Sequence, residues 1–265
     1  MTQPLQGDLS GKVAIITGST QGIGEAIAHR VADWGGAGVV VTGRDQARGE
    51  AVAHALEAKG ARAVFVAAEL GEADAAGRIA DACQAAFGRV DCLVNAAAST
   101  ARGGLLDAEA GFVDAMFAAN VRAPFLLMQA AARMMRDAGQ GGSMVNILSM
   151  NAHCGTPELA VYSATKGALA TLTRNAADAL KADRIRVNGI NLGWADTPAE
   201  RTLQERISPH GKDWLEQAGR TRPFGRLIET GEVADLAAFL LSANAGLMTG
   251  ALIDYEQWVV GAPPP

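Results

Sequence analysis

The sequence predicts a single α/β domain, in which helices cover both faces of a doubly wound sheet of seven parallel strands. Seven short apolar runs recur along the 265 residues, and helical patterns separate most of them. The runs are continuous rather than alternating, which is typical of strands that are covered on both faces. At this length, one such domain (1–265) buries about three-quarters of the surface that its unfolded chain exposes. It therefore needs no disulfide or metal to stabilise it.

The predicted strands follow the apolar runs, which occupy residues 13–16, 38–41, 63–66, 92–94, 144–148, 185–190 and 250–253. Helical patterns lie between them, at residues 22–34, 45–59, 72–87, 107–138, 158–181 and 230–243. Asp107 is expected to cap the fourth helix, and Thr156-Pro157 offers the fifth a cap followed by proline at its first position. Prolines and glycines interrupt residues 194–228, so we interpret this segment as an irregular insertion that forms a substrate lid, the alternative being a simple loop.

Charge, hydropathy and cysteine content exclude several classes of partner. The net charge is −5 with no dense basic run, which argues against nucleic acid. No signal-peptide core is seen at the N-terminus, and no stretch reaches the ~18 apolar residues of a membrane span. The three cysteines (Cys83, Cys92 and Cys154) cannot all pair and match no metal framework. We therefore expect a cytoplasmic protein with neither a metal site nor a membrane partner.

A glycine-rich turn directly follows the first strand and precedes a helix. Gly18, Gly22 and Gly24 permit close backbone approach, and the helix start supplies unpaired amides, which together suit a pyrophosphate. The alternative is a glycine-rich turn that binds no ligand. The residues of this turn that we expect to bind a dinucleotide are Gly18, Ser19, Thr20, Gln21, Gly22, Ile23 and Gly24.

The end of the second strand bears on the choice of dinucleotide. A carboxylate at this point would bond the 2′-hydroxyl of the adenosine ribose, but Gly43 occupies the position and Arg44 follows it. An arginine can pair with a 2′-phosphate through two hydrogen bonds. The sequence thus favours NADP(H) and leaves NAD(H) open, because Arg44 could also be a solvated surface residue.

Four residues form a candidate catalytic group. Tyr162 and Lys166 are four apart on one helix, so both project from the same face. A nearby ammonium would favour the phenolate and let Tyr162 act as acid and base. Ser149, at the end of the preceding strand, could hold a substrate oxygen, and Asn120 could bind a water that connects Lys166 to solvent. Taken singly, each has a structural explanation; their joint occurrence favours catalysis.

The chain resembles the short-chain dehydrogenase/reductase family in its single-domain form of about 250 residues, with a Rossmann-type sheet. The motifs are Thr17-Gly18-x3-Gly22-Ile23-Gly24, Asn95-Ala96-Ala97-Ala98, Asn120, Ser149, Tyr162-x3-Lys166 and Asn191-Leu192-Gly193 with Thr197. The resemblance implies that Tyr162 and Lys166 contact the cofactor as well as the substrate oxygen. It also implies further cofactor contacts from Glu69, Leu70, Asn95, Ala96, Gly193, Ala195 and Thr197. Ala96 and Leu192 replace the Asn and Pro that are usual in the family.

The expected reaction is hydride transfer between a secondary alcohol and a ketone. Side chains expected to line the substrate pocket are Ser149, Asn151, His153, Tyr162 and Trp194. Their polarity favours a small sugar, polyol or hydroxy acid. Other readings are a 3-oxoacyl-type ketone reductase, a catalytically silent NADP-binding sensor or scaffold, an epimerase or dehydratase, and a methyltransferase. The resemblance also implies a homotetramer or homodimer. The large aromatics Tyr255 and Trp258 suit a buried contact with another subunit, or could pack on their own.

Overall fold

The computed structural model describes residues 8–262 and contains the expected seven-stranded parallel sheet, with strand order β3-β2-β1-β4-β5-β6-β9. Its strands are β1 (Val13–Thr17), β2 (Gly38–Gly43), β3 (Arg62–Ala67), β4 (Cys92–Asn95), β5 (Gly142–Ile147), β6 (Ile185–Leu192) and β9 (Leu252–Tyr255). The strand order reverses between β1 and β4, where Thr17 is in register with Asn95. In such sheets the ligand crevice lies beyond the carboxyl ends of the strands at this point.

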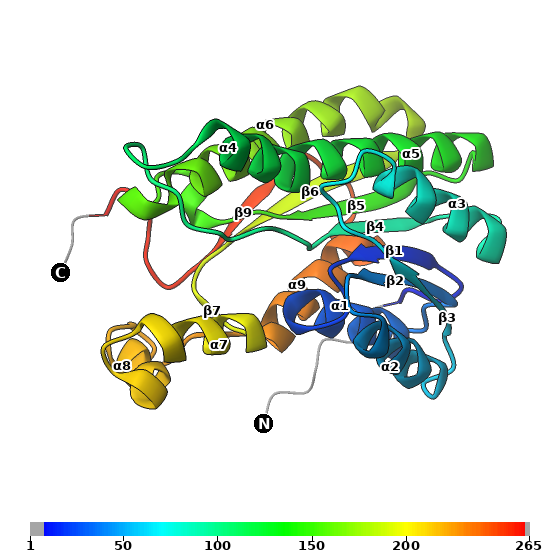
Figure 1. The fold of residues 1–265 in the computed structure, drawn as a ribbon. Helices are drawn as coiled ribbons and strands as arrows, with labels where there is room; N and C mark the ends of the chain where they lie inside the picture. Colours follow the sequence, from blue (N-terminus) through cyan, green and yellow to red (C-terminus); the bar gives the residue numbers. More distant parts are fainter. Residues whose placement is uncertain (1–7, 263–265) are drawn as a thin grey trace.

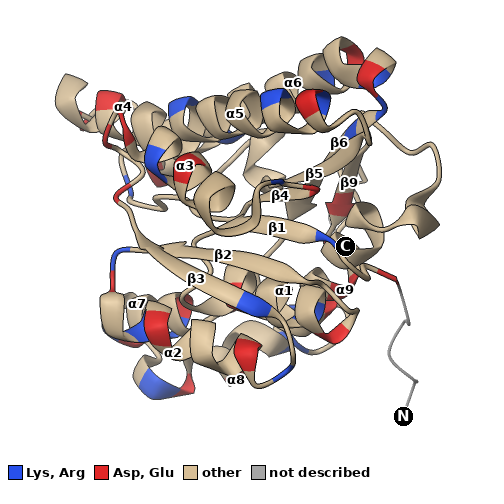
Figure 2. Ribbon diagram, turned by 90° about the vertical axis from the view of Figure 1, so that its right-hand side faces the viewer, with Lys and Arg blue, Asp and Glu red and all other residues tan. Residues whose placement is uncertain are grey.

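Helices cover both faces of the sheet (Figure 1). One layer consists of α1 (Gly22–Asp33), α2 (Gln46–Glu57) and α9 (Thr230–Leu241). The other consists of α3 (Ala75–Phe87), α4 (Ala110–Phe117), α5 (Ala123–Ala138) and α6 (Ala160–Leu180). Every residue of β1 is buried, and the central strands are nearly free of the charged residues, which lie mostly on helices and loops (Figure 2). This distribution explains the continuous apolar runs, because each central strand has a core on both sides.

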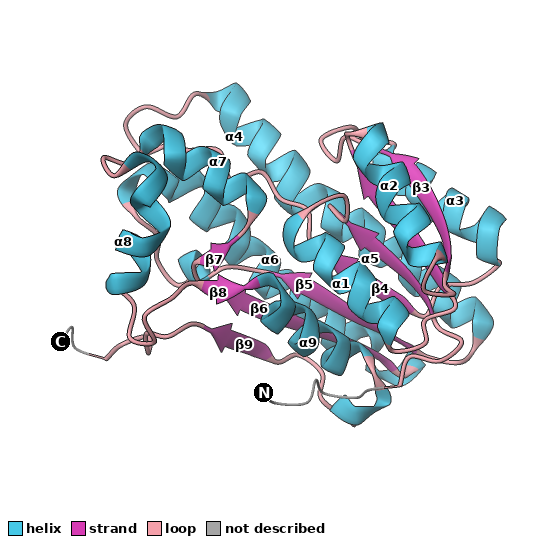
Figure 3. Cartoon of the chain, turned by 90° about the horizontal axis from the view of Figure 1, so that it is seen from below, coloured by secondary structure: helices cyan, strands magenta, loops and turns pink. Residues whose placement is uncertain are grey.

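The segment 194–228 is more regular than its sequence suggested. It contains β7 (Ala195–Asp196), α7 (Pro198–Ile207) and α8 (Trp214–Arg220), and β7 pairs with β8 (Ile228–Glu229) in a small second sheet (Figure 3). Pro198 is the first residue of α7, where its fixed φ suits the helix, and Thr197 caps that helix by accepting a hydrogen bond from the Glu200 amide. The prediction of an irregular insertion was therefore wrong: Pro198 starts a helix here instead of breaking one.

Two boundaries also differ from the prediction. Asp107 does not cap a helix; its Oδ1 accepts a hydrogen bond from the Gly104 amide at 2.7 Å, and Glu109 is the N-cap residue of α4. The last strand begins at Leu252 rather than 250, because Gly250 adopts φ +73° and turns the chain first.

The predicted helix 107–138 is a continuous helical run over Ala110–Ala138, with a π-helical segment, η1 (Ala118–Arg122), between α4 and α5. By length and composition this run could cross a membrane, so the expectation that no segment could do so does not hold for it. Its apolar character has a structural explanation. Along α5, Leu127, Ala131 and Met135 are buried in the core cluster that also contains residues of α3 and the sheet.

All three cysteines are free. Their odd number already required that at least one of them be unpaired. Cys83 and Cys92 are buried in the core, whereas Cys154 is exposed in the loop after β5. Burial raises the pKa of Cys83 and of Cys92 to about 12 in each case.

Candidate active site

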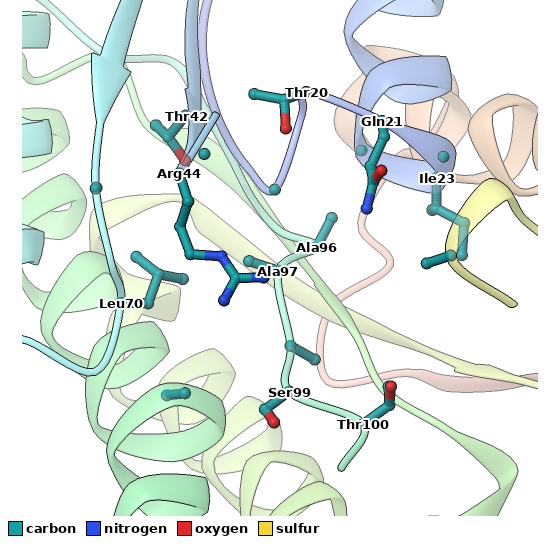
Figure 4. A pocket seen from close by; sticks show the side chains of 18 of the residues that line it. Thr20, Gln21, Ile23, Thr42, Arg44, Leu70, Ala96, Ala97, Ser99 and Thr100 are labelled. Atoms are coloured by element: carbon teal, nitrogen blue, oxygen red, sulfur yellow. The ribbon is translucent and has the colours of Figure 1, made fainter. Parts of the chain in front are cut away.

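A cleft of about 480 Å³ opens at the carboxyl ends of β1, β2 and β4, where the strand order reverses. Its lining comes from the glycine-rich turn, the ends of β2 and β3, the segment after β4, and the start of α7 (Figure 4). Of the predicted cofactor residues, the cleft is lined by Gly18, Thr20, Gln21, Gly22, Ile23, Gly24, Arg44, Glu69, Leu70, Ala96 and Thr197. The structure thus brings together residues that lie far apart in the sequence.

The glycine-rich turn has no room for side chains. A Cβ at Gly24 would collide with the carbonyl oxygen of Gly18, and a Cβ at Gly18 would lie 2.8 Å from the Cα of Ala97. Gly18 and Gly22 adopt φ values of +65° and +62°, which L side chains rarely adopt. The bare backbone at the start of α1 therefore fits a pyrophosphate, because amides can approach its oxygens without steric obstruction. The residues present fit a bound dinucleotide.

The side chains of two predicted cofactor residues bond to the protein itself. Ser19 is fully buried; its hydroxyl donates to the Ile16 carbonyl at 2.6 Å and accepts from the Thr42 amide at 3.0 Å, so it joins β1 to β2. The Asn95 amide nitrogen donates to Oδ1 of Asn146 at 2.8 Å. This contact links β4 to β5. Neither side chain lines the cleft.

The end of the cleft beside β2 carries two arginines. Arg44 is 80% exposed, lines the cleft, and pairs with Glu69 at 3.4 Å. Arg48, which belongs to none of the sequence motifs, also lines the cleft and donates to Oε1 of Gln21 at 2.5 Å. Gly43 has no side chain, and its surroundings leave no room for one, because a Cβ there would lie 2.5 Å from Cγ2 of Thr20.

Tyr162 and Lys166 lie one turn apart on the buried face of α6. The Lys166 ammonium is 2% exposed and donates a hydrogen bond to the Ile147 carbonyl at 2.7 Å. Its Nζ is 5.7 Å from the centre of the Tyr162 ring. Burial lowers the pKa of Lys166 to about 8, because water no longer solvates the ammonium.

Ser149 is buried beside Tyr162, at the end of β5. Its Oγ accepts a hydrogen bond from the Asn151 amide at 3.2 Å and so begins the short 3₁₀ turn η2 (Met150–Ala152). Burial raises the pKa of Tyr162, while its hydrogen bond with Ser149 lowers that pKa and the negative charge of Glu200 raises it. The net effect is a raised pKa for Tyr162, so a nearby cation is needed for this phenol to ionise near neutral pH.

Asn120 lies in the π-helical segment η1, and such segments are frequent at functional sites. Its Oδ1 accepts from the Ser99 amide at 2.8 Å, while its Nδ2 donates to the Ser99 carbonyl at 2.9 Å and to Oγ1 of Thr165 at 3.1 Å. The side chain is thus engaged with the segment after β4 and with α6, next to Lys166. It connects the cleft lining to the catalytic helix rather than presenting a free amide to water.

The predicted substrate residues have varied surroundings. His153 is engaged by β9, since its Nε2 is 3.1 Å from Oδ1 of Asp254, and Asn191 also donates to that oxygen, at 2.7 Å. Trp194 donates through Nε1 to Oε1 of Glu200 at 2.9 Å.

Two further residues were predicted to contact the cofactor. Ala195 is buried in β7, and Gly193 lies against the Glu256 carboxylate. Neither of these two lines the cleft.

Several lining residues were not foreseen from the sequence: Thr42, Arg48, Ala68, Ala97, Ser99, Thr100, Ala101, Ala119 and Ala199. Most are small and carry no reactive group, so no chemical signal marks them. Arg48 could have been found, because it lies in the first turn of the helix that follows Arg44. Within residues 8–262, no group of three or more His, Cys, Asp or Glu side chains is arranged to hold a metal ion.

The chain is similar to known oxidoreductases over nearly its whole length. A family model described as enoyl-(acyl carrier protein) reductase matches residues 18–256. The cis-4-hydroxycyclohexanecarboxylate dehydrogenase of Sinomonas cyclohexanicum is 34% identical, over 91% of this chain and 94% of the relative. The (3R)-3-hydroxyacyl-CoA dehydrogenase of Rattus norvegicus is 31% identical, over 93% and 95%.

Among solved structures, the L-sorbose reductase of Gluconobacter frateurii, in complex with NADPH and L-sorbose, superposes with a TM-score of 0.90. It is 28% identical, and the match covers 98% of this chain and 100% of the reductase. The likeness therefore extends through the sheet, the cleft and the segment 194–228.

Proposed function

This chain belongs to the short-chain dehydrogenase/reductase family, and we propose that it interconverts a secondary alcohol and a ketone with NADP(H), using Tyr162 as the acid/base. One observation carries this assignment. The Lys166 ammonium is buried beside the Tyr162 ring, at the same end of the sheet as the glycine-lined cleft. Membership of an oxidoreductase family argues against the alternative of a methyltransferase. The presence of both Tyr162 and Lys166 argues against a catalytically silent scaffold.

The residues divide the chemistry as follows. A bound nicotinamide supplies or accepts the hydride. Tyr162 gives a proton to the carbonyl oxygen during reduction and takes it back during oxidation. Ser149 holds the same oxygen by a hydrogen bond, and the Lys166 ammonium favours the phenolate electrostatically. The Asn120 side chain links Ser99, in the cleft lining, to Thr165, which precedes Lys166 on α6.

The preference for NADP(H) rests on Arg44 and Arg48. Both guanidinium groups line the β2 end of the cleft, where a 2′-phosphate would lie, and Gly43 presents no carboxylate to repel it. The Gluconobacter reductase in complex with NADPH supports the same choice. Glu69 forms an ion pair with Arg44, and this ion pair would have to break for Arg44 to bind the 2′-phosphate.

The substrate that we propose is a small polar carbonyl or alcohol compound, such as a sugar or polyol. The similarity to an L-sorbose reductase over the whole chain supports this class. The similarity to a (3R)-3-hydroxyacyl-CoA dehydrogenase favours a second candidate, a 3-oxoacyl-type substrate. The two classes differ in size, charge and apolar area, so one substrate panel separates them.

A calorimetric titration with NADPH and NADH, followed by absorbance assays with a panel of sugars, polyols and acyl thioesters, tests this proposal. NADPH should bind at least tenfold more tightly than NADH, which corresponds to about 1.4 kcal/mol. Equal binding would refute the NADP(H) assignment. Failure to oxidise NADPH or NADH with every carbonyl tried would refute the oxidoreductase assignment itself.

We further propose a homotetramer or homodimer in the cytoplasm. Three large apolar side chains are partly exposed: Phe117 on α4 (36%), Phe125 on α5 (44%) and Trp258 near the C-terminal end (40%). Large apolar side chains that remain exposed favour contact with another subunit. Light scattering at micromolar concentration tests the assembly, and a monomer would refute it.

A further inference from the structure

The short turn that follows Ser149 determines which way its hydroxyl group donates. Oγ of Ser149 accepts from the Asn151 amide at 3.2 Å, and the Ser149 carbonyl accepts from the Ala152 amide at 2.9 Å. A serine hydroxyl has one hydrogen to donate and two lone pairs that accept. Because the Asn151 amide occupies a lone pair, the hydroxyl hydrogen remains available for a substrate oxygen. The turn η2 therefore orients Ser149 as a donor.

The residue that ends this turn is bound to the central sheet. The His153 amide donates to the Met150 carbonyl at 3.0 Å, and its ring nitrogen Nε2 lies 3.1 Å from Oδ1 of Asp254. Because an ionised carboxylate only accepts hydrogen bonds, Nε2 carries the hydrogen in this contact. The two residues are 101 positions apart in the sequence, so this contact ties the end of the turn to β9.

The Asp254 carboxylate is itself fixed on rigid elements. It lies on β9 in register with Asn191 on β6, and Nδ2 of Asn191 donates to its Oδ1 at 2.7 Å. The two strands are neighbours in the central sheet (Figure 3). Burial raises the pKa of Asp254, but the hydrogen bonds from Asn191 and His153 outweigh this effect and leave that pKa below its usual value. The sheet thus holds an ionised carboxylate, and the carboxylate holds His153.

The segment 149–155 is supported differently at its far end. A Cβ at Gly155 would lie 2.0 Å from Oγ of Ser163, so the chain packs directly against α6 there. The His153 side chain, by contrast, is 41% exposed. Its contact with Asp254, rather than burial in the core, therefore restrains the middle of the segment.

We propose that His153 is a positioning residue: held by Asp254, it fixes the turn η2 and so keeps the Ser149 hydroxyl directed at the substrate oxygen. This inference rests on the proposed function, and it differs from the expectation that His153 contacts the substrate. An interaction that is stronger in the transition state than in the bound substrate raises kcat. Loss of the anchor should therefore lower kcat with little change in KM, whereas loss of a direct substrate contact would raise KM.

A double-mutant cycle on this pair tests the proposal. We would measure kcat and KM for the NADPH-dependent reduction of L-sorbose and of acetoacetyl-CoA by the wild type, His153→Ala, Asp254→Ala and the double variant. His153→Gln keeps a side-chain N–H for the carboxylate. The matched control is His54→Ala, because His54 also pairs with a carboxylate, that of Glu57, on the exposed side of α2.

Two further measurements need no substrate. NADPH affinity and thermal unfolding would show that each variant is folded. Hydrogen exchange of the peptide 149–155 would report the turn itself, because the amides of residues 151–153 all donate within it. Faster exchange in His153→Ala and Asp254→Ala, with unchanged exchange in His54→Ala, is expected.

His153→Ala and Asp254→Ala should each lower kcat roughly tenfold, which corresponds to about 1.4 kcal/mol in the activation free energy. KM should stay within about threefold of the wild type. The double variant should lose no more than either single variant, because the two side chains act as one unit. His153→Gln should recover most of the lost kcat, and His54→Ala should match the wild type.

Three results would overturn the inference. Unchanged kcat in His153→Ala would remove its basis, and so would losses that add up in the double variant. A raised KM in His153→Ala with no effect of Asp254→Ala would assign His153 to the substrate and leave the oxidoreductase assignment standing. Absence of wild-type turnover with every carbonyl and both dinucleotides would refute the proposed function, and this inference with it.

Discussion

The ammonium nitrogen of Lys166 lies 5.7 Å from the centre of the Tyr162 ring, and the Ile147 carbonyl holds it there by a 2.7 Å hydrogen bond. The two side chains have opposite requirements. Burial raises the pKa of the phenol and lowers that of the amine to about 8. Burial thus disfavours the charged form of each group, and an ammonium this close to the ring is the cation that would favour the phenolate.

Tyr162→Phe should abolish most of the catalysis without disturbing the fold. The substitution removes the hydroxyl and keeps the buried ring, so we expect kcat to fall by roughly 10²–10⁴-fold. NADPH affinity should stay within about twofold of the wild type, because the cleft lining is unchanged. Retention of more than about a tenth of kcat would exclude Tyr162 as the acid/base.

Lys166→Met should inactivate the enzyme and yet stabilise its fold at pH 7. The pKa of this amine falls from 10.5 to about 8 on folding. Its burial as a cation therefore costs about 3 kcal/mol below pH 8. Loss of the hydrogen bond to Ile147 offsets about 1 kcal/mol of that gain. The expected net gain is about 1–2 kcal/mol in urea unfolding.

The pH dependence of this gain has a definite sign. Between pH 8 and 10.5 the unfolded chain holds the Lys166 proton and the folded chain does not. Wild-type stability therefore rises with pH in that window, and the Lys166→Met variant lacks this contribution. The stability difference between them should narrow from pH 7 to pH 10. A constant difference, or a less stable variant at pH 7, would contradict the assignment.

Arg44→Ala and Arg48→Ala should each weaken NADPH binding about tenfold and leave NADH binding within about twofold, because only NADPH carries the 2′-phosphate. Arg78→Ala is the matched control, since Arg78 is exposed, pairs with Glu72 and does not line the cleft. Calorimetry with both dinucleotides provides the comparison. Equal losses for NADPH and NADH would assign these arginines to general electrostatic attraction.

Gly24→Ala should prevent dinucleotide binding, because the new Cβ would collide with the Gly18 carbonyl in the turn. Gly77→Ala provides the contrast: Gly77 lies within α3, and a Cβ there meets nothing within 4 Å. That second change should stabilise the protein by about 0.5–1 kcal/mol. Thermal unfolding with and without NADPH would distinguish the two variants. Normal NADPH binding by Gly24→Ala would show that the turn can relax.

The sequence predicts best where its pattern has one physical solution. Continuous apolar runs require strands covered on both faces, and every predicted strand is present. The spacing of Tyr162 and Lys166 also predicts their common face, because helical geometry alone determines it. The pattern failed where a residue type has two uses. Pro198 can break a helix or begin one, and only the preceding Thr197 cap decides between them.

The partners of buried polar side chains could not be predicted, because tertiary contacts determine them. Ser19 lies within the glycine-rich turn, yet its hydroxyl joins two strands. His153 is close to Ser149 in sequence, but Asp254, about a hundred residues later, engages it. Glu200 is a further case, since nothing in the sequence indicates that Trp194 and Gln204 donate to its carboxylate.

The uneven exposure of the three cysteines makes this chain convenient to label. A thiol must ionise before it attacks a maleimide, and the pKa values of about 12 leave Cys83 and Cys92 almost wholly protonated at neutral pH. Cys154 is exposed and lies five residues after Ser149. A spin label or dye should therefore attach at Cys154 alone, and would probe the segment that follows Ser149 without any engineered cysteine.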